Sequence, residues 1–215
     1  MKVRITKDPE VRKNEILDAA SALFLSKGYV KTTVSDIIEV VDIAKGTFYY
    51  YFKSKEEVMN ALAERFIDNA TQYMQQMLDA KLPAAEKMRR LITDSGNLGG
   101  VEMAEQLHQA NNTEMHLKSI VGAIHSCSHA VGEIVQQGIN EGIYRTKYPR
   151  EIAIIMLAAS NFLFDEAIFS WKKDELARLA EAYASIIEQV LGVEAGGLSY
   201  IAESIMKSGV GHAKP

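Results

Sequence analysis

Apolar residues recur three or four positions apart along almost the whole chain of 215 residues, which is the spacing of helices with one buried face. Asp8 and Pro9 suit the cap and first turn of a helix, and Gly28 suits its end. Further helices are predicted at about 33–41, 46–51, 54–82, 86–93, 102–109, 113–141, 149–171, 174–191 and 198–207. The pattern therefore predicts an all-α fold.

Two short helices separated by a tight turn are predicted between the first helix and the fourth, which begins near Ser54. Thr33 followed by Asp36 is a capping signature that opens the first of them. The second is too short to be stable alone in water, so Phe48 and Phe52, four positions apart, are expected to anchor it. Its outward faces carry side chains that can donate to phosphates and reach base edges in a major groove, namely Lys45, Thr47, Tyr49, Tyr50 and Tyr51. This geometry is that of a DNA-reading helix-turn-helix.

At these residues the chain resembles the TetR family (TetR/AcrR type) of bacterial transcriptional regulators. The family pattern has a Thr that opens the first reading helix, then G-x-x-x-G-T-aromatic-Tyr, then F-x-S/N-K-E. Thr33, residues 45–49 and residues 52–56 match it, and the resemblance covers roughly residues 9–60. The chain departs from the pattern at Asp42, where the family usually has Gly, and at Ala44, where it often has a capping Ser or Thr.

The resemblance implies two domains. An N-terminal three-helix helix-turn-helix DNA-binding domain is expected over residues 1–55, followed by a larger helical ligand-binding and dimerisation domain over residues 56–215. In the family the last two large helices form a four-helix dimer interface, and the predicted helices 149–171 and 174–191 occupy that place. Residues 152–164 are apolar on nearly every side, so they either form the centre of this domain or pack against a second copy. A homodimer implies a palindromic operator with half-sites about 34–36 Å apart.

The three consecutive tyrosines are expected to divide their roles. Successive helical positions point about 100° apart, so the three rings cannot all face one core. Tyr49 and Tyr51 are expected to contact phosphates, and Tyr50 is expected to point toward the bases. The resemblance implies the same assignment and completes the DNA-binding set with Lys45, Gly46 and Thr47 on the recognition helix and Thr33 and Lys55 on the DNA backbone.

Charge is distributed unevenly in a way that agrees with DNA binding. The net charge of the chain is −4. Residues 1–55 hold ten Lys and Arg against seven Asp and Glu, a balance of +3, so the remainder carries −7. A local basic surface attracts phosphate whatever the whole-chain balance is.

Several residues in the second part of the chain are candidates for an effector pocket. The methionines suit a pocket for apolar molecules and ordinary core filling equally. Polar groups at 161 and 165 interrupt the apolar helix, and His125 and His129, four apart on the long helix, have the spacing of metal ligands, with His108 and His116 nearby. Against a metal site, Cys127 projects from the opposite side of that helix; the histidines otherwise line a polar part of the pocket or pair with Glu. The candidate pocket set is Met74, Met77, Met88, Met103, Met115, His125, His129, Asn161 and Asp165.

The sequence gives little support for other classes of protein. It has no Gly-rich phosphate loop and no nucleophile elbow, so an enzyme is not expected, and no cofactor or bound metal is assigned. The longest apolar run, residues 152–159, is short of the roughly 20 residues that cross a membrane, and residues 1–10 are charged, so a cytoplasmic protein is expected. The predicted function is a ligand-responsive transcriptional repressor that binds a palindromic operator as a homodimer and is released or modulated by a small-molecule effector. The alternative is a metal- or redox-responsive regulator that uses His125 and His129 or Cys127.

Overall fold

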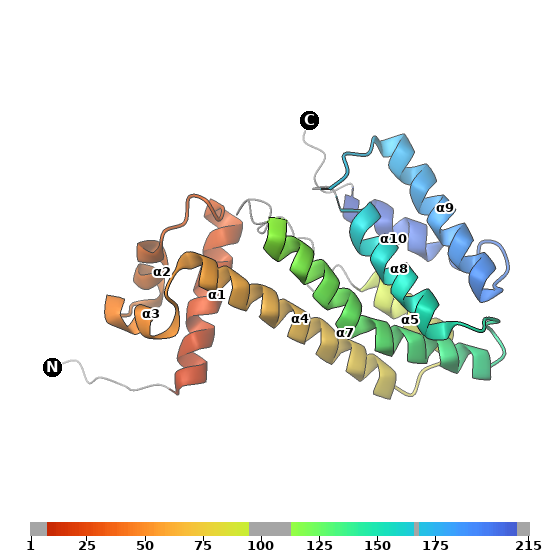
Figure 1. Ribbon diagram of the computed structural model, residues 1–215, viewed down its shortest axis with the longest axis horizontal. Helices are drawn as coiled ribbons and strands as arrows, with labels where there is room; N and C mark the ends of the chain where they lie inside the picture. The colour runs from red at the N-terminus through yellow and green to blue at the C-terminus, as the bar shows by residue number, and fades with distance from the viewer. Residues whose placement is uncertain (1–7, 95–112, 166–167, 210–215) are drawn as a thin grey trace. The chain divides into compact units, whose positions relative to one another are not determined.

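A computed structural model describes residues 8–94, 113–165 and 168–209 (Figure 1). Every regular element in these ranges is a helix, which confirms the predicted all-α fold. The helices are α1 (Pro9–Lys27), α2 (Val34–Val41), α3 (Lys45–Tyr51), α4 (Lys55–Asp79), α5 (Ala84–Thr93), α7 (Thr113–Asn140), α8 (Pro149–Leu163), α9 (Lys173–Leu191) and α10 (Tyr200–Gly209). The predicted helix at 102–109 lies outside the described residues.

One predicted helix end is wrong. The helix expected to reach residue 171 ends at Leu163. The indole N–H of Trp171 donates to the carbonyl oxygen of Leu163 at 2.8 Å, and the rings of Phe162 and Phe169 meet edge to face at 5.8 Å. The indole supplies a hydrogen-bond partner for a carbonyl that the end of the helix leaves without one.

The described residues form two compact units. One contains residues 8–65 and 113–116, and the other contains 66–94, 117–165 and 168–209. α4 begins in the first unit and ends in the second. The functional boundary predicted after residue 55 stays a prediction.

The first unit has its own hydrophobic core, to which α1, α2, α3 and α4 each contribute. α1 and α2 pack together, and the start of α4 closes the core with apolar side chains at helical spacing. The buried members are Ile16, Leu17, Ala20, Phe24, Tyr29, Ile37, Phe48, Phe52, Val58, Met59 and Leu62.

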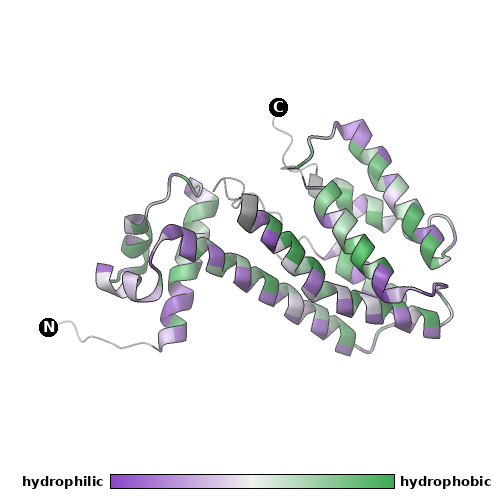
Figure 2. Cartoon of the chain, in the orientation of Figure 1, coloured by the Kyte–Doolittle hydropathy of each residue, from purple (hydrophilic) through white to green (hydrophobic). Residues whose placement is uncertain are grey.

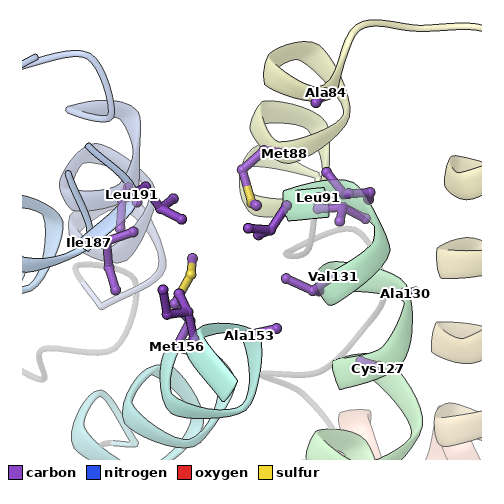
Figure 3. Packing of buried hydrophobic residues seen from close by; sticks show 14 of the residues in the cluster. Ala84, Met88, Leu91, Cys127, Ala130, Val131, Ala153, Met156, Ile187 and Leu191 are labelled. Carbon is purple, nitrogen blue, oxygen red and sulfur yellow. The ribbon is translucent and has the colours of Figure 1, made fainter. Parts of the chain in front are cut away.

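The second unit has a larger core. Apolar side chains of α5, α7, α8 and α9 point toward one another at its centre, among them Met88, Val131, Met156 and Ile187 (Figure 3). Hydrogen bonds from polar side chains also join its helices. The Tyr183 hydroxyl of α9 donates to the Met156 carbonyl of α8 at 2.8 Å, and the Ser204 hydroxyl of α10 donates to the Ile92 carbonyl of α5 at 2.9 Å.

Among the described helices, none combines the length and apolar character needed to cross a membrane.

The close packing of α7 against the segment that follows it leads to a stability prediction. A Cβ at Gly138 would lie 2.1 Å from Cδ2 of Tyr144, whose side chain is buried. Gly138→Ala is therefore expected to lower the free energy of unfolding in urea by about 1–3 kcal/mol or more, because the ring has nowhere to move in a packed core. Gly46→Ala is the matched control, since nothing lies within 4 Å of a Cβ there. An unchanged urea midpoint for Gly138→Ala would contradict this packing.

Candidate nucleic-acid interface

The interface begins at the N-terminus of α2, where the predicted capping box is present. The Thr33 hydroxyl accepts from the Asp36 N–H at 3.1 Å, and the Asp36 carboxylate accepts from the Thr33 N–H at 2.7 Å. The Lys27 ammonium pairs with the same carboxylate at 2.6 Å. Lys27 lies in the last turn of α1, so this ion pair links α1 to the start of α2. Sequence reasoning did not find it, because nothing local connects the two positions.

The turn between α2 and α3 contains one left-handed residue. Asp42 has φ 53° and ψ 53°, a conformation that favours glycine and that Asp tolerates better than most residues. Its N–H donates to the Glu39 carbonyl at 3.2 Å, and the Ile43 N–H donates to the Ile38 carbonyl at 3.2 Å. These bonds end α2 and turn the chain toward α3.

α3 is held by packing and not by a cap. Ala44 occupies the N-cap position and its side chain makes no capping hydrogen bond, as its methyl group dictates. Phe48 and Phe52 are 0% and 2% exposed, with ring centroids 6.1 Å apart, which confirms the two predicted anchors. The helix begins at Lys45, one residue before the predicted start.

The side chains predicted to meet DNA lie mostly on the outward side of α3. Tyr50 is 77% exposed and Tyr49 is 46% exposed, while Tyr51 is half-buried against the core of the first unit. The Lys45 ammonium lies 5.9 Å from the centre of the Tyr49 ring, and the rings of Tyr50 and Tyr51 meet edge to face at 4.9 Å. Lys45, Gly46 and Thr33 are exposed and Thr47 is half-buried.

Lys55, also predicted on the DNA backbone, is directed into its own unit. Its ammonium donates to the carbonyl oxygens of Tyr29 at 2.7 Å and Thr32 at 2.9 Å. It also lies 4.1 Å from the centre of the Tyr29 ring. Two of its three N–H donors are therefore engaged within the protein, and a phosphate contact by this side chain would use the third.

The effector-pocket assignment stays a prediction, and the structure places the described members of the set as follows. Met74, Met77 and Met88 are buried in the core of the second unit. The Asn161 amide donates to the Leu157 carbonyl of its own helix at 2.8 Å, and Asp165 is half-buried just after α8. Met103 and the side chain of Met115 lie outside the described residues.

The histidine pair and Cys127 lie on different sides of α7. His125 and His129 are exposed, whereas Cys127 is buried, and this burial raises the pKa of its thiol. Among the described residues, no group of three or more His, Cys, Asp or Glu is arranged to hold a metal ion. His108 lies outside the described residues.

Apolar side chains are exposed along α8 and α9 of the second unit. Residues on the buried side of α8, such as Ala153 and Met156, belong to the core, yet the helix is apolar on most sides (Figure 2). The exposed apolar surface, which we call the α8–α9 surface, consists of Ile154, Ile155, Phe162, Ile186 and Val190. Large exposed apolar patches are typical of protein–protein interaction sites.

The capping box of α2 leads to a pH prediction. Hydrogen bonds from Lys27 and then from Thr33 lower the pKa of Asp36 to about 2. In the unfolded chain the pKa of an Asp is about 3.9, so the stability contributed by this carboxylate is present above about pH 4 and is lost as the pH falls toward 2. The difference in urea midpoint between the wild type and Asp36→Asn is expected to shrink over that window. Asp68→Asn, at an exposed position of α4, controls for the loss of a charge; a difference that stays constant with pH would contradict the role of Asp36.

Known proteins with similar sequences are DNA-binding regulators. The chain is 25% identical over 187 residues to the HTH-type transcriptional regulator YhgD of Bacillus subtilis (strain 168), an alignment that covers 82% of this chain and 93% of that protein. It is 34% identical over 87 residues to the HTH-type transcriptional repressor KstR2 of Mycolicibacterium smegmatis, covering 40% of this chain and 42% of that protein.

Solved structures share the fold at low sequence identity. A transcriptional regulator of the TetR/AcrR family from Thermobifida fusca YX-ER1 has a TM-score of 0.58 at 17% identity, covering 95% of this chain and all of the other. The reduced form of Escherichia coli NemR has a TM-score of 0.60 at 17% identity, covering 86% of this chain and 99% of the other.

Two family models match separate parts of the chain, and together they cover more than half of it. The model for bacterial regulatory proteins of the tetR family matches residues 16–62, which include all of α2 and α3. The model for the tetracyclin repressor-like C-terminal domain matches residues 98–193. This is a family of transcriptional regulators and not of enzymes, as expected from the sequence. With a capped α2, a left-handed turn and an aromatic α3 in the matched region, the chain belongs to the tetR family of bacterial regulatory proteins.

Proposed function

We propose that this regulator is a homodimeric, ligand-responsive repressor that binds a palindromic operator and is released or modulated by a small-molecule effector. The observation that carries the proposal is the exposure of Tyr50 at 77% on a helix that is itself anchored to the core. A large ring that is exposed to solvent on an anchored helix contributes little to the stability of the fold. It is well placed to contact base edges.

The DNA contacts are divided between α3 and its neighbours. Tyr50 contacts base edges, Tyr49 and Tyr51 bind phosphates, and Lys45 and Thr47 complete the recognition helix. Thr33 contacts the backbone from the start of α2. Contacts to phosphate set the register of the protein on the duplex, and contacts to bases select the sequence.

Nothing in the described part of the protein explains why residue 46 is a glycine. Its backbone is not in the left-handed region, and nothing lies within 4 Å of a Cβ built on it. Neither conformation nor packing within the chain therefore requires glycine there. Close approach of a DNA backbone would require glycine at this position, because a residue without a side chain leaves the peptide surface uncovered.

The α8–α9 surface is the proposed dimer interface, and its occupant is a second copy of the chain. Ile155 is 62% exposed on α8 and Ile186 is 56% exposed on α9. Two such surfaces brought together by a two-fold axis bury apolar area from both copies, which stabilises the pair. The division into a DNA-binding part over residues 1–55 and an effector-binding and dimerisation part over residues 56–215 belongs to the same proposal.

The effector is proposed to be a small molecule bound by the second unit. A relative that is 25% identical over 180 residues, covering 81% of this chain and 91% of its own length, is the fatty acid metabolism regulator protein of Bacillus subtilis (strain 168). A gamma-butyrolactone receptor has a similar fold, with a TM-score of 0.55 at 16% identity. These relatives support an apolar or amphipathic effector. Such a ligand shifts DNA binding only by its difference in affinity for two states of the protein.

Selection of the purified protein against random duplex DNA tests the DNA-binding proposal. The wild type is expected to enrich an inverted repeat with half-sites about one helical turn apart. Tyr50→Ala is expected to change the enriched sequence, because a base contact is worth about 1–3 kcal/mol of discrimination. Gly46→Ala is expected to keep the sequence preference and the stability but to bind every duplex more weakly. Binding without enrichment, or a Tyr50→Ala pool identical to that of the wild type, would overturn this assignment.

Sedimentation of variants tests the dimer interface. Ile155→Asp is expected to convert the dimer to a monomer, because a charge would be buried without a partner between the two copies. It should leave the fold intact, since the side chain is exposed within one chain. Ile143→Asp, at an exposed apolar position of the same unit outside α8 and α9, is the matched control and should stay dimeric. A monomeric wild type would contradict the proposed homodimer, and a dimeric Ile155→Asp would be evidence for a different interface.

A further inference from the structure

Lys55 occupies an unusual place for a cation. It is the first residue of α4, where the helix dipole presents its positive end, and a lysine there is unfavourable unless other groups compensate. Glu56 and Glu57 follow it in the same turn. The oxygens nearest to the ammonium are the carbonyls of Tyr29 and Thr32, at 2.7 and 2.9 Å, and the face of the Tyr29 ring lies beside it. The partial negative charge that holds this cation therefore comes from within the protein.

The two carbonyls belong to the connection between α1 and α2. Gly28 leaves α1 in the left-handed region with φ 84°, and the chain then turns back through Tyr29 to Thr32. The Thr32 side chain is 1% exposed and its hydroxyl donates to the Gly28 carbonyl at 2.8 Å. This turn, in which Tyr29 and Thr32 are buried, directly precedes Thr33, the N-cap of α2. Fixing the Thr32 carbonyl therefore fixes where α2 begins.

Tyr29 is held by two neighbouring residues of α4. Its ring is 6% exposed and packs edge to face on Phe24, with centroids 5.0 Å apart. Lys55 contacts its carbonyl oxygen and its ring face, while burial and the Glu56 carboxylate raise the pKa of its phenol to about 12. The first turn of α4 thus contacts the backbone, the ring and the hydroxyl of Tyr29 in the α1–α2 connection.

We propose that Lys55 is a positioning residue that fastens the α1–α2 connection to the start of α4, and so sets the placement of α2 and α3 for DNA, instead of binding phosphate with its ammonium. The inference rests on the proposed DNA-binding function and reassigns a residue that the sequence predicted on the DNA backbone. The carbonyl and ring contacts are reproducible by an arginine, which has several donors and stacks on aromatic rings. They are not reproducible by a methionine, which keeps the apolar stem and loses the charge.

The test compares Lys55→Met, Lys55→Arg and Lys45→Ala as full-length proteins on the operator enriched by the wild type. Binding is measured over a series of salt concentrations at a temperature where circular dichroism shows each variant to be folded. Lys55→Met is expected to lose affinity by about tenfold, the size of one lost specific contact, with an unchanged slope of log K against log salt. Lys55→Arg should recover most of that affinity. Lys45→Ala, at an exposed position of the reading helix, is expected to reduce the slope by up to about one unit if its charge meets a phosphate.

Three outcomes would overturn the proposal. A slope for Lys55→Met that falls by about one unit with no loss of thermal stability would assign the ammonium to a phosphate. Unchanged affinity of the folded Lys55→Met protein would show a role in stability alone. Failure of Lys55→Arg to recover affinity would show that the carbonyl and ring contacts are not what matters. If the wild type itself binds no duplex, the proposed function has failed, and that result is read before any variant is made.

Discussion

Burial of Phe48 and Phe52 is the interaction on which the candidate interface depends. α3 has seven residues and no side-chain cap, and isolated helices shorter than about 12–15 residues are marginal in water. Burying a phenylalanine fully contributes about 1.5–3 kcal/mol, so two of them outweigh the missing cap, which is worth about 1 kcal/mol. Because both rings point inward, the helical period turns Tyr49 and Tyr50 outward. The same packing that makes α3 stable therefore decides which of its side chains solvent, or DNA, meets.

α4 links this constraint to the rest of the chain. Its first turn contacts the α1–α2 connection through Lys55 and Glu56, and its last turns place Met74 and Met77 in the core of the second unit. One continuous helix is therefore part of both cores, and each core is built mainly from its own helices. A substitution in one core is therefore expected to disturb mainly the helices that build that core.

The features that sequence predicted well are local. Thr33 and Asp36 are three residues apart, and Phe48 and Phe52 are four apart, so helical geometry alone fixes their relation. The features that it missed are contacts made in the folded chain: Lys55 reaches a carbonyl 26 residues earlier, and Trp171 donates to Leu163 at the end of α8. Chemistry also limited the prediction for the methionines, because a thioether suits a core and a pocket equally. Residue type therefore does not decide between those uses, and the pocket assignment stays a prediction.

Amide hydrogen exchange of the full-length protein, with and without its selected duplex, tests the central claim most directly. The account holds that an anchored α3 is the surface that meets DNA, so exchange should slow at the amides of α3 and at the start of α2 when the duplex is added. The amides at the centre of the second unit should change little by comparison, because their core does not contact DNA. Slowing confined to α8, α9 and α10, with α3 unaffected, would contradict the account and place the DNA-binding surface elsewhere.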